Sequence, residues 1–269
     1  KIKKYFVEYL EYHSEEVNTS YCFISWLERG GDQELIEKYL IEFLQENSKD
    51  EKTSFVLKAW LERNGDKQLI KEYLIEFLQE NAKYESSSHV FSSWFDQNGD
   101  KELVKEYLIE FLQENTTNES ISYVISSWLN QSGDKKLIKE YLIQFLQENS
   151  KNENTCYILG SWLDQDGDKT LIKEYLIQFL QENAKNENTS HVFNSWLDKD
   201  GDKTLIKEYL VKYLQENAKN AKTSYVLNSW LDKDGDKELI KEYLVKYLQE
   251  NAQNTQTAYI YSIWLNKGG

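Results

Sequence analysis

Tryptophan recurs in this chain at a fixed interval of 34 residues, with no insertion or deletion between one occurrence and the next. The eight positions are Trp26, Trp60, Trp94, Trp128, Trp162, Trp196, Trp230 and Trp264. A constant period of this length accommodates two helices and their turns, and it is typical of stacked repeats. We therefore predict an all-α fold, a right-handed α-solenoid of about eight 34-residue helix-turn-helix repeats, forming a single array over residues 1–269.

The second half of each repeat has the pattern of a long amphipathic helix. In the repeat that follows Trp230 this helix is expected at about 236–251, because its apolar residues recur with helical spacing. They are Leu239, Ile240, Tyr243, Leu244, Tyr247 and Leu248. Asp236 precedes them and is suited to cap the first N–H groups of the helix and to oppose the positive end of its dipole.

A shorter helix is expected at about 224–232, with Thr223 or Ser224 as its N-terminal cap. Asp234 and Gly235 follow it and predict a turn that tolerates left-handed backbone conformation. The tryptophan of this helix could belong to an exposed aromatic ladder or to the core between the two helices. Its helical spacing from other apolar residues favours the core, where large aromatic side chains contribute most.

The net charge of −14 and the pI near 4.8 argue against nucleic acid and anionic membranes as partners, and they permit cationic ones. The sequence contains neither an apolar run long enough to span a bilayer nor a signal peptide. Localisation stays open, with a slight preference for the cytoplasm. Because the chain lacks methionine and begins in the middle of a repeat, we expect it to be an excerpt of a longer protein.

No pattern in the chain indicates catalysis, so we predict a protein that is not an enzyme and has no catalytic residue, metal site or cofactor. The three histidines are His13, His89 and His191, and the last two occupy equivalent positions three repeats apart. The two cysteines, Cys22 and Cys156, lie four repeats apart, whereas a disulfide requires Cα atoms within about 7 Å. We expect both to be free thiols.

The turn at 197–209 resembles the calcium loop of an EF-hand, with Asp198, Asp200 and Asp202 at its first three ligand positions. The resemblance implies a calcium site, but Lys203 replaces the glycine that the sharp turn needs and Tyr209 replaces the bidentate glutamate. The sequence therefore favours a helix cap with a solvated acidic turn.

The repeat is also similar to that of transcription activator-like effectors, which has the same length and a short helix, a reading loop and a longer helix. Here the residues that match are Leu57, Trp60, the pair Arg63-Asn64 and the segment Gly65-Asp66-Lys67-Gln68. The resemblance implies DNA reading, but Asp66 and its equivalents place a carboxylate where a phosphate would bind the helix N-terminus. Tetratricopeptide repeats share the period and the helix-pair plan but not the motif, which contains proline; this chain has none.

Three columns of residues differ between repeats and indicate where a partner could bind. Five residues before each tryptophan stands an aromatic ring or an imidazole: Tyr21, Phe55, His89, Tyr123, Tyr157, His191, Tyr225 and Tyr259. Two residues before it the side chain varies freely: Ile24, Lys58, Ser92, Ser126, Gly160, Asn194, Asn228 and Ser262. Two residues after it the side chain is acidic or an amide: Glu28, Glu62, Asp96, Asn130, Asp164, Asp198, Asp232 and Asn266.

The spacing of the three columns places them on one side of the short helix, away from its buried side. They predict an acidic, aromatic-lined groove for a protein or a basic peptide, in which carboxylates and rings bind Lys or Arg side chains. Our hypothesis is a non-catalytic scaffold for protein–protein or peptide binding. Its alternatives are packing of the rings between repeats, a nucleic-acid-binding array, a calcium-stabilised array, and a purely structural repeat that associates end to end.

Overall fold

The computed structural model describes residues 2–268, apart from the side chain of Gln256, and every regular element in that range is helical. The helices group into two compact parts, an N-terminal part (Lys1–Gly133) and a C-terminal part (Asp134–Gly269). In both parts a short helix alternates with a long one at the period of the tryptophans. The predicted all-α solenoid is confirmed.

In residues 2–268 the eight short helices are α2 (Ser20–Glu28), α4 (Thr53–Glu62), α6 (Ser87–Asp96), α8 (Ser120–Asn130), α10 (Thr155–Asp164), α12 (Thr189–Asp198), α14 (Thr223–Asp232) and α16 (Gln256–Asn266). The long helices are α1 (Ile2–His13), α3 (Glu37–Asn47), α5 (Lys67–Asn81), α7 (Lys101–Glu114), α9 (Lys135–Asn149), α11 (Lys169–Asn183), α13 (Lys203–Asn217) and α15 (Lys237–Glu250). A single turn of 3₁₀ helix, η1 (Val17–Thr19), precedes α2.

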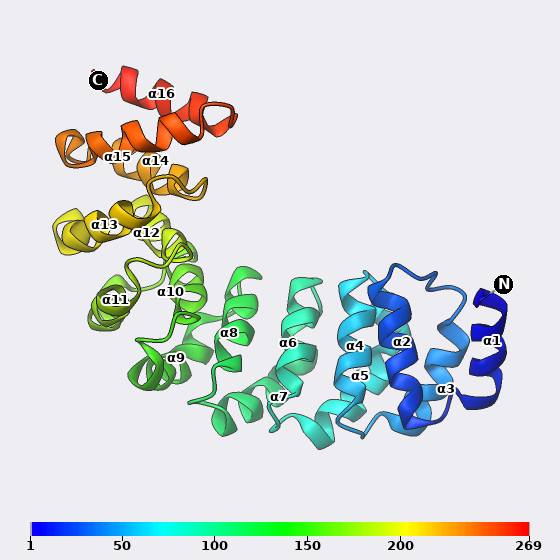
Figure 1. Ribbon diagram of the computed structural model, residues 1–269. Coiled ribbons are helices and arrows are strands. Elements are labelled where there is room, and N and C mark those ends of the chain that lie inside the picture. The colour runs from blue at the N-terminus through cyan, green and yellow to red at the C-terminus, as the bar shows by residue number, and fades with distance from the viewer. Residues whose placement is uncertain (1, 269) are drawn as a thin grey trace. The chain divides into compact units, whose positions relative to one another are not determined.

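Within each part, consecutive short helices pack against one another more extensively than consecutive long helices do. In the N-terminal part, Figure 1 shows α2, α4, α6 and α8 side by side in one layer, with the long helices in a second layer. In the C-terminal part α10, α12, α14 and α16 pack in the same sequence. The short helices therefore form a continuous layer within each part.

The tryptophans belong to the core, as the spacing predicted. The indoles of the six interior repeats are 1–3% exposed, whereas Trp26 and Trp264 are half-buried. An indole side chain buries roughly 200 Å², which corresponds to about 5 kcal/mol before conformational entropy is subtracted. Leucine, isoleucine, valine and phenylalanine from both layers complete the core.

The long helices begin as predicted. Asp66, Asp100, Asp134, Asp168, Asp202 and Asp236 are the N-caps of α5, α7, α9, α11, α13 and α15, and each carboxylate accepts the N–H of the second helical residue. α3 differs, since its first turn is irregular and its N-cap is Ile36.

The predicted caps of the short helices are wrong. Thr223 is already helical in α14, and Lys222 occupies the cap position without a side-chain hydrogen bond. Instead of accepting N–H groups, the Thr223 hydroxyl donates to the Asn217 carbonyl at 2.5 Å, and the Ser224 hydroxyl donates to the Ala221 carbonyl at 2.8 Å. These hydroxyls therefore satisfy carbonyls at the end of the preceding helix and in the turn that follows it.

Candidate functional site

The turn after each short helix is fixed by its tryptophan. In the repeat of Trp196, the Asp200 N–H donates to the Leu197 carbonyl and the Gly201 N–H donates to the Trp196 carbonyl, at 2.9 and 2.8 Å. This pair of bonds is the Schellman motif. The left-handed residue is Asp200, with φ of 55°, and not the glycine.

Gly201 serves a different purpose, because the indole of Trp196 lies directly over its Cα. A Cβ at this position would meet Trp196 Cε2 and Nε1 at 2.3 Å. The same indole donates from Nε1 to the Asp202 carbonyl at 3.1 Å, so it connects the short helix to the N-cap of the next long helix. Equivalent contacts recur at Gly31, Gly65, Gly99, Gly133, Gly167 and Gly235.

Within each part, polar side chains connect neighbouring repeats. Lys203 donates from Nζ to the carbonyl of Lys233, which is the C-cap of α14 in the next repeat. The first lysine of each other long helix from α5 onward donates in the same way to the carbonyl 30 residues further along the chain. At the other end of the long helix, Asn217 donates from Nδ2 to the Lys185 carbonyl of the preceding repeat at 2.7 Å and to the Tyr213 carbonyl at 3.1 Å.

The aspartates that resemble calcium ligands are engaged in other contacts. Lys233 binds Asp200 at 2.8 Å, and this hydrogen bond and positive charge hold the pKa of the Asp200 carboxyl below its ordinary value of 3.8. Hydrogen bonds from the hydroxyl and N–H of Thr204 lower the pKa of Asp202 in the same way. Among residues 2–268, no group of three or more His, Cys, Asp or Glu side chains is arranged to hold a metal ion.

Two of the three variable columns are exposed on the short helices, and the column between them is mostly half-buried. Every ring in the column five residues before tryptophan is exposed, from 39% for Tyr157 to 62% for Tyr21 among the tyrosines. The column two residues after tryptophan is exposed throughout, and the column between them ranges from buried Gly160 to exposed Ser262. The structure therefore brings the predicted site residues of each part onto one face.

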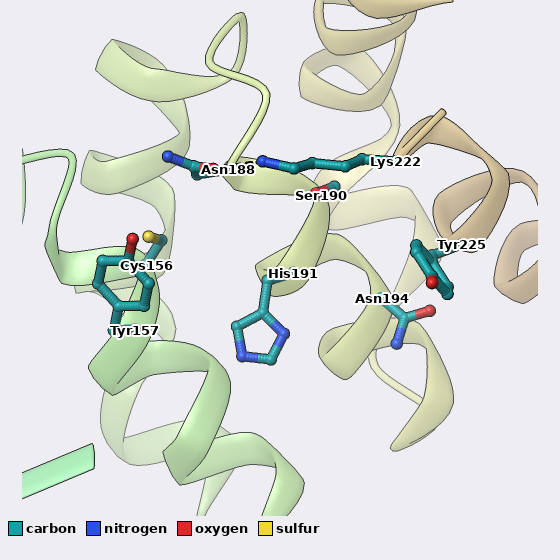
Figure 2. A pocket seen from close by; sticks show the side chains of 8 residues that line it. All are labelled: Cys156, Tyr157, Asn188, Ser190, His191, Asn194, Lys222 and Tyr225. Carbon is teal, nitrogen blue, oxygen red and sulfur yellow. Dashed lines mark hydrogen bonds between the residues drawn. The ribbon is translucent and has the colours of Figure 1, made fainter. Parts of the chain in front are cut away.

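Two hollows occur on this face in the C-terminal part. The first, of about 510 Å³, lies between α10, α12 and α14. Figure 2 shows Tyr157 and Cys156 on one side of it, Asn194 and Tyr225 on the other, and the ring of His191 between them. Asn188, Ser190 and Lys222 complete its lining.

The second hollow, of about 400 Å³, adjoins the first and lies between α12, α14 and α16. We call it the Tyr225–Tyr259 pocket. Its lining is Asn194, Asp198, Tyr225, Asn228, Ser229, Asp232, Tyr259 and Ile263. Six of these eight residues belong to the three predicted columns, so this pocket consists mainly of side chains that the sequence singled out.

Neighbouring repeats determine the shape of the groove jointly. A Cβ on Gly160 would meet the ring of His191 at 2.4 Å, so the glycine in one repeat allows the imidazole of the next to lie against α10. His191 Nε2 is 3.9 Å from Asp164 Oδ2. In the following pair of repeats, Ser229 donates from Oγ to Asn194 Oδ1 at 2.6 Å. The position of His191 against α10 is packing of a ring between repeats, one of the alternatives that the sequence left open, whereas the bond between Ser229 and Asn194 was not predicted.

The N-terminal part has the same organisation with different chemistry. Phe55 contacts His89, with ring centroids 5.3 Å apart, and Lys58 binds Glu62 at 2.9 Å. Burial lowers the pKa of His89, and the positive charge of Lys58 lowers it further. Lys58 therefore stands in the column that holds Asn194 and Asn228 in the C-terminal part.

Neither cysteine is part of a nucleophilic pair. Both are free thiols, as predicted, and Cys156 is 2% exposed. Burial raises the pKa of Cys156 to about 11, and burial also raises the pKa of Cys22. A thiol protonated to this degree is a poor nucleophile near neutral pH.

The resemblance to transcription activator-like effectors implies that DNA phosphates bind at the N-termini of the long helices. In this chain the aspartate caps occupy those N-termini. Asp66 Oδ1, for example, accepts the Gln68 N–H at 2.8 Å. An N–H group that a phosphate would need is therefore already bonded, beside a negative charge.

The fold and the repeated contacts define this chain as a helical-repeat protein of the α-solenoid class. No protein-family model matches it, and no curated protein is detectably similar to it in sequence. Within the part of the chain that the structure describes, no helix is both long and apolar enough to cross a membrane.

Proposed function

We propose that this protein is a non-catalytic scaffold that binds basic peptides, or basic segments of proteins, along the short-helix face. The observation that carries the proposal is the exposure of rings and carboxylates on the short-helix face within each part, together with the two adjoining hollows between α10 and α16. The long helices contribute residues to neither hollow.

The exposed tyrosines support binding because a tyrosine offers a large contact area and loses little side-chain entropy when it is covered. Tyr157, Tyr225 and Tyr259 are 39%, 50% and 60% exposed, although their helices are firmly packed. Rigid rings on a rigid layer provide the aromatic anchors that dominate many peptide interfaces.

The charge of the face supports a cationic partner. Asp164, Asp198 and Asp232 are exposed at the C-terminal ends of α10, α12 and α14, where the helix dipoles add negative potential. The nearest lysines, Lys199 and Lys233, form ion pairs with other carboxylates, Asp166 and Asp200, each at 2.8 Å, and Lys233 also acts electrostatically on Asp198 and Asp232.

Fluorescence anisotropy with labelled 12-residue peptides tests the proposal. Peptides that alternate Lys or Arg with small residues are expected to bind, and binding should weaken as salt rises because exposed charges are screened. Acidic peptides of the same length should not bind.

The variant Tyr225→Ala should weaken binding of the basic peptides by about tenfold, the usual effect of removing an aromatic anchor. Tyr261→Ala is the matched control, because Tyr261 is 49% exposed on α16 but lines neither hollow. Equal effects of the two variants, or binding of duplex DNA in place of the peptides, would overturn the proposal.

A further inference from the structure

The Tyr225–Tyr259 pocket and the adjoining hollow differ in the charge of their linings. The adjoining hollow contains Lys222, which binds Glu187 and Asn188, each at 2.9 Å, and contains no carboxylate. The Tyr225–Tyr259 pocket contains two carboxylates and no cation. Two neighbouring hollows on one groove therefore favour different side chains of a partner.

We propose that the Tyr225–Tyr259 pocket is a subsite for the guanidinium group of an arginine side chain. This inference rests on the proposed peptide-binding function and specifies one side chain of the partner and its position. It commits to arginine over lysine and over methylated lysine, for reasons that lie in the donors, acceptors and rings of the lining.

Acceptors dominate the polar lining. The carboxylates of Asp198 and Asp232 are negative. Asn194 Nδ2 donates to Asp198 Oδ2 at 3.1 Å, and the charge of Lys233, which does not line the pocket, acts on both carboxylates. The Ser229 hydroxyl, a donor, is already used in its bond to Asn194. A ligand that enters this pocket must therefore supply donors and positive charge.

Asn228 adds a further acceptor. Its Oδ1 is buried and has no hydrogen-bond partner among the described residues. A buried amide oxygen without a partner costs free energy, and rotation about the last side-chain bond can present it to a donor in the pocket. An ammonium group has three donors at one point, whereas a guanidinium has five in a planar fork and can reach acceptors on several sides.

The rings complete the argument for a planar cation. Tyr225 and Tyr259 occupy equivalent positions on α14 and α16, one repeat apart, and both line the pocket. Guanidinium groups stack on tyrosine faces while their edges bind carboxylates, and the more strongly hydrated ammonium of lysine does so less well. Methylated lysine would fit the rings but would leave the carboxylates and amides without donors.

The experiment uses the whole chain labelled with ¹⁵N and three single-residue probes: N-acetyl-arginine amide, N-acetyl-lysine amide and N-acetyl-trimethyllysine amide. Titration is followed through the side-chain amide of Asn228 and the backbone amides of Tyr259 and Ile263. The arginine probe should shift these signals with a dissociation constant of about 1–10 mM, and the lysine probe should bind at least about threefold more weakly.

The double variant Asp198→Asn/Asp232→Asn keeps the shape of the lining and should weaken the arginine probe by about fivefold or more. The control is Glu182→Gln, which removes an exposed carboxylate of the long helix α11, outside both hollows and outside the three columns, and should leave the titration unchanged. Chemical shifts elsewhere report directly whether the variants fold.

The outcomes separate this inference from the proposed function. If basic peptides bind but the arginine probe does not, or if lysine or trimethyllysine binds as well as arginine, the arginine subsite is wrong and the scaffold stands. If the arginine probe binds at these signals while no peptide binds, the subsite stands and the scaffold is wrong.

Discussion

The contact between tryptophan and glycine allows a stability prediction that separates two explanations of the Asp-Gly turn. Gly201 does not adopt a left-handed conformation, whereas Asp200 does. Alanine at position 201 therefore needs no left-handed backbone, and the three atoms nearest to its Cβ all belong to the indole of Trp196. We predict that Gly201→Ala destabilises the protein through this side-chain contact alone.

The magnitude follows from the structure. An alanine Cβ would lie 2.3 Å from two atoms of an indole that is 3% exposed, so the ring must move within a packed core. Overpacking of this kind costs about 1–3 kcal/mol, and displacing the ring from its 3.1 Å bond to the Asp202 carbonyl adds about 1 kcal/mol. The expected loss is about 2–4 kcal/mol, or a fall in Tm of about 5–15 °C.

Urea unfolding monitored by circular dichroism measures the effect, with thermal unfolding as a second readout. The mutated repeat has a neighbouring repeat on each side, so that fraying at the ends of the array does not mask the change. Asp200→Gly is the control. Glycine adopts the left-handed conformation of position 200 without strain, and the ion pair that is lost with Lys233 is exposed, so the stability should change far less than in Gly201→Ala.

A double-mutant cycle provides the decisive comparison. In the background Trp196→Leu, which removes the ring, the cost of Gly201→Ala should fall below about 1 kcal/mol. A cost that is unchanged in this background would refute the steric explanation, and so would a wild-type cost below about 0.5 kcal/mol.

Two further predictions follow from the contacts between repeats. Asn217→Ala removes hydrogen bonds to the Lys185 and Tyr213 carbonyls and should lower the free energy of unfolding by about 1–3 kcal/mol in urea titrations. The control, Gln215→Ala, changes an exposed residue of the same helix and should have little effect. Equal losses in the two variants would contradict this role of Asn217. The lowered carboxyl pKa values of Asp166, Asp200 and Asp234 stabilise the folded state above the ordinary pKa of 3.8, and this contribution is lost as pH falls through the lowered values. The triple Asp→Asn variant should therefore lose less stability than wild type on acidification, and identical pH profiles of Tm would contradict the assignment.

The fold was largely predictable because the residues that it buries recur at regular intervals in the sequence. A tryptophan every 34 residues and the i, i+4 spacing around Leu244 predicted the helix pair, the core and the Asp236 cap, and all three are confirmed. The role of Thr223 was mispredicted, because a hydroxyl beside a helix start can donate to a carbonyl as readily as it accepts an N–H.

The contacts between repeats could not be derived from the sequence. Lys203 was noted only because it breaks the calcium-loop pattern, yet it binds the carbonyl of Lys233 in the next repeat. A backbone carbonyl exists at every residue, so the partner of such a lysine leaves no trace in the sequence. The recurrence of lysine after each Gly-Asp pair from Lys67 onward was the one available signal.

The candidate site was predictable as three columns but not as a surface with distinct hollows. Helical spacing places Tyr225, Asn228 and Asp232 on one side of a helix without reference to any neighbour. How Gly160 accommodates His191, or how Asn194 meets Ser229, depends on the offset between adjacent helices. That offset is a property of packing, and the sequence of one repeat does not contain it.

The bonds between repeats also restrict how this chain can change in length. Lys203 reaches a carbonyl 30 residues ahead, Asn217 reaches one 32 residues behind, and Lys233 pairs with a carboxylate 33 residues behind. Deleting one residue would shift all three donors away from their acceptors at once, whereas deleting 34 would supply each donor with an equivalent acceptor. Such a chain is expected to tolerate insertions and deletions only when they comprise whole repeats.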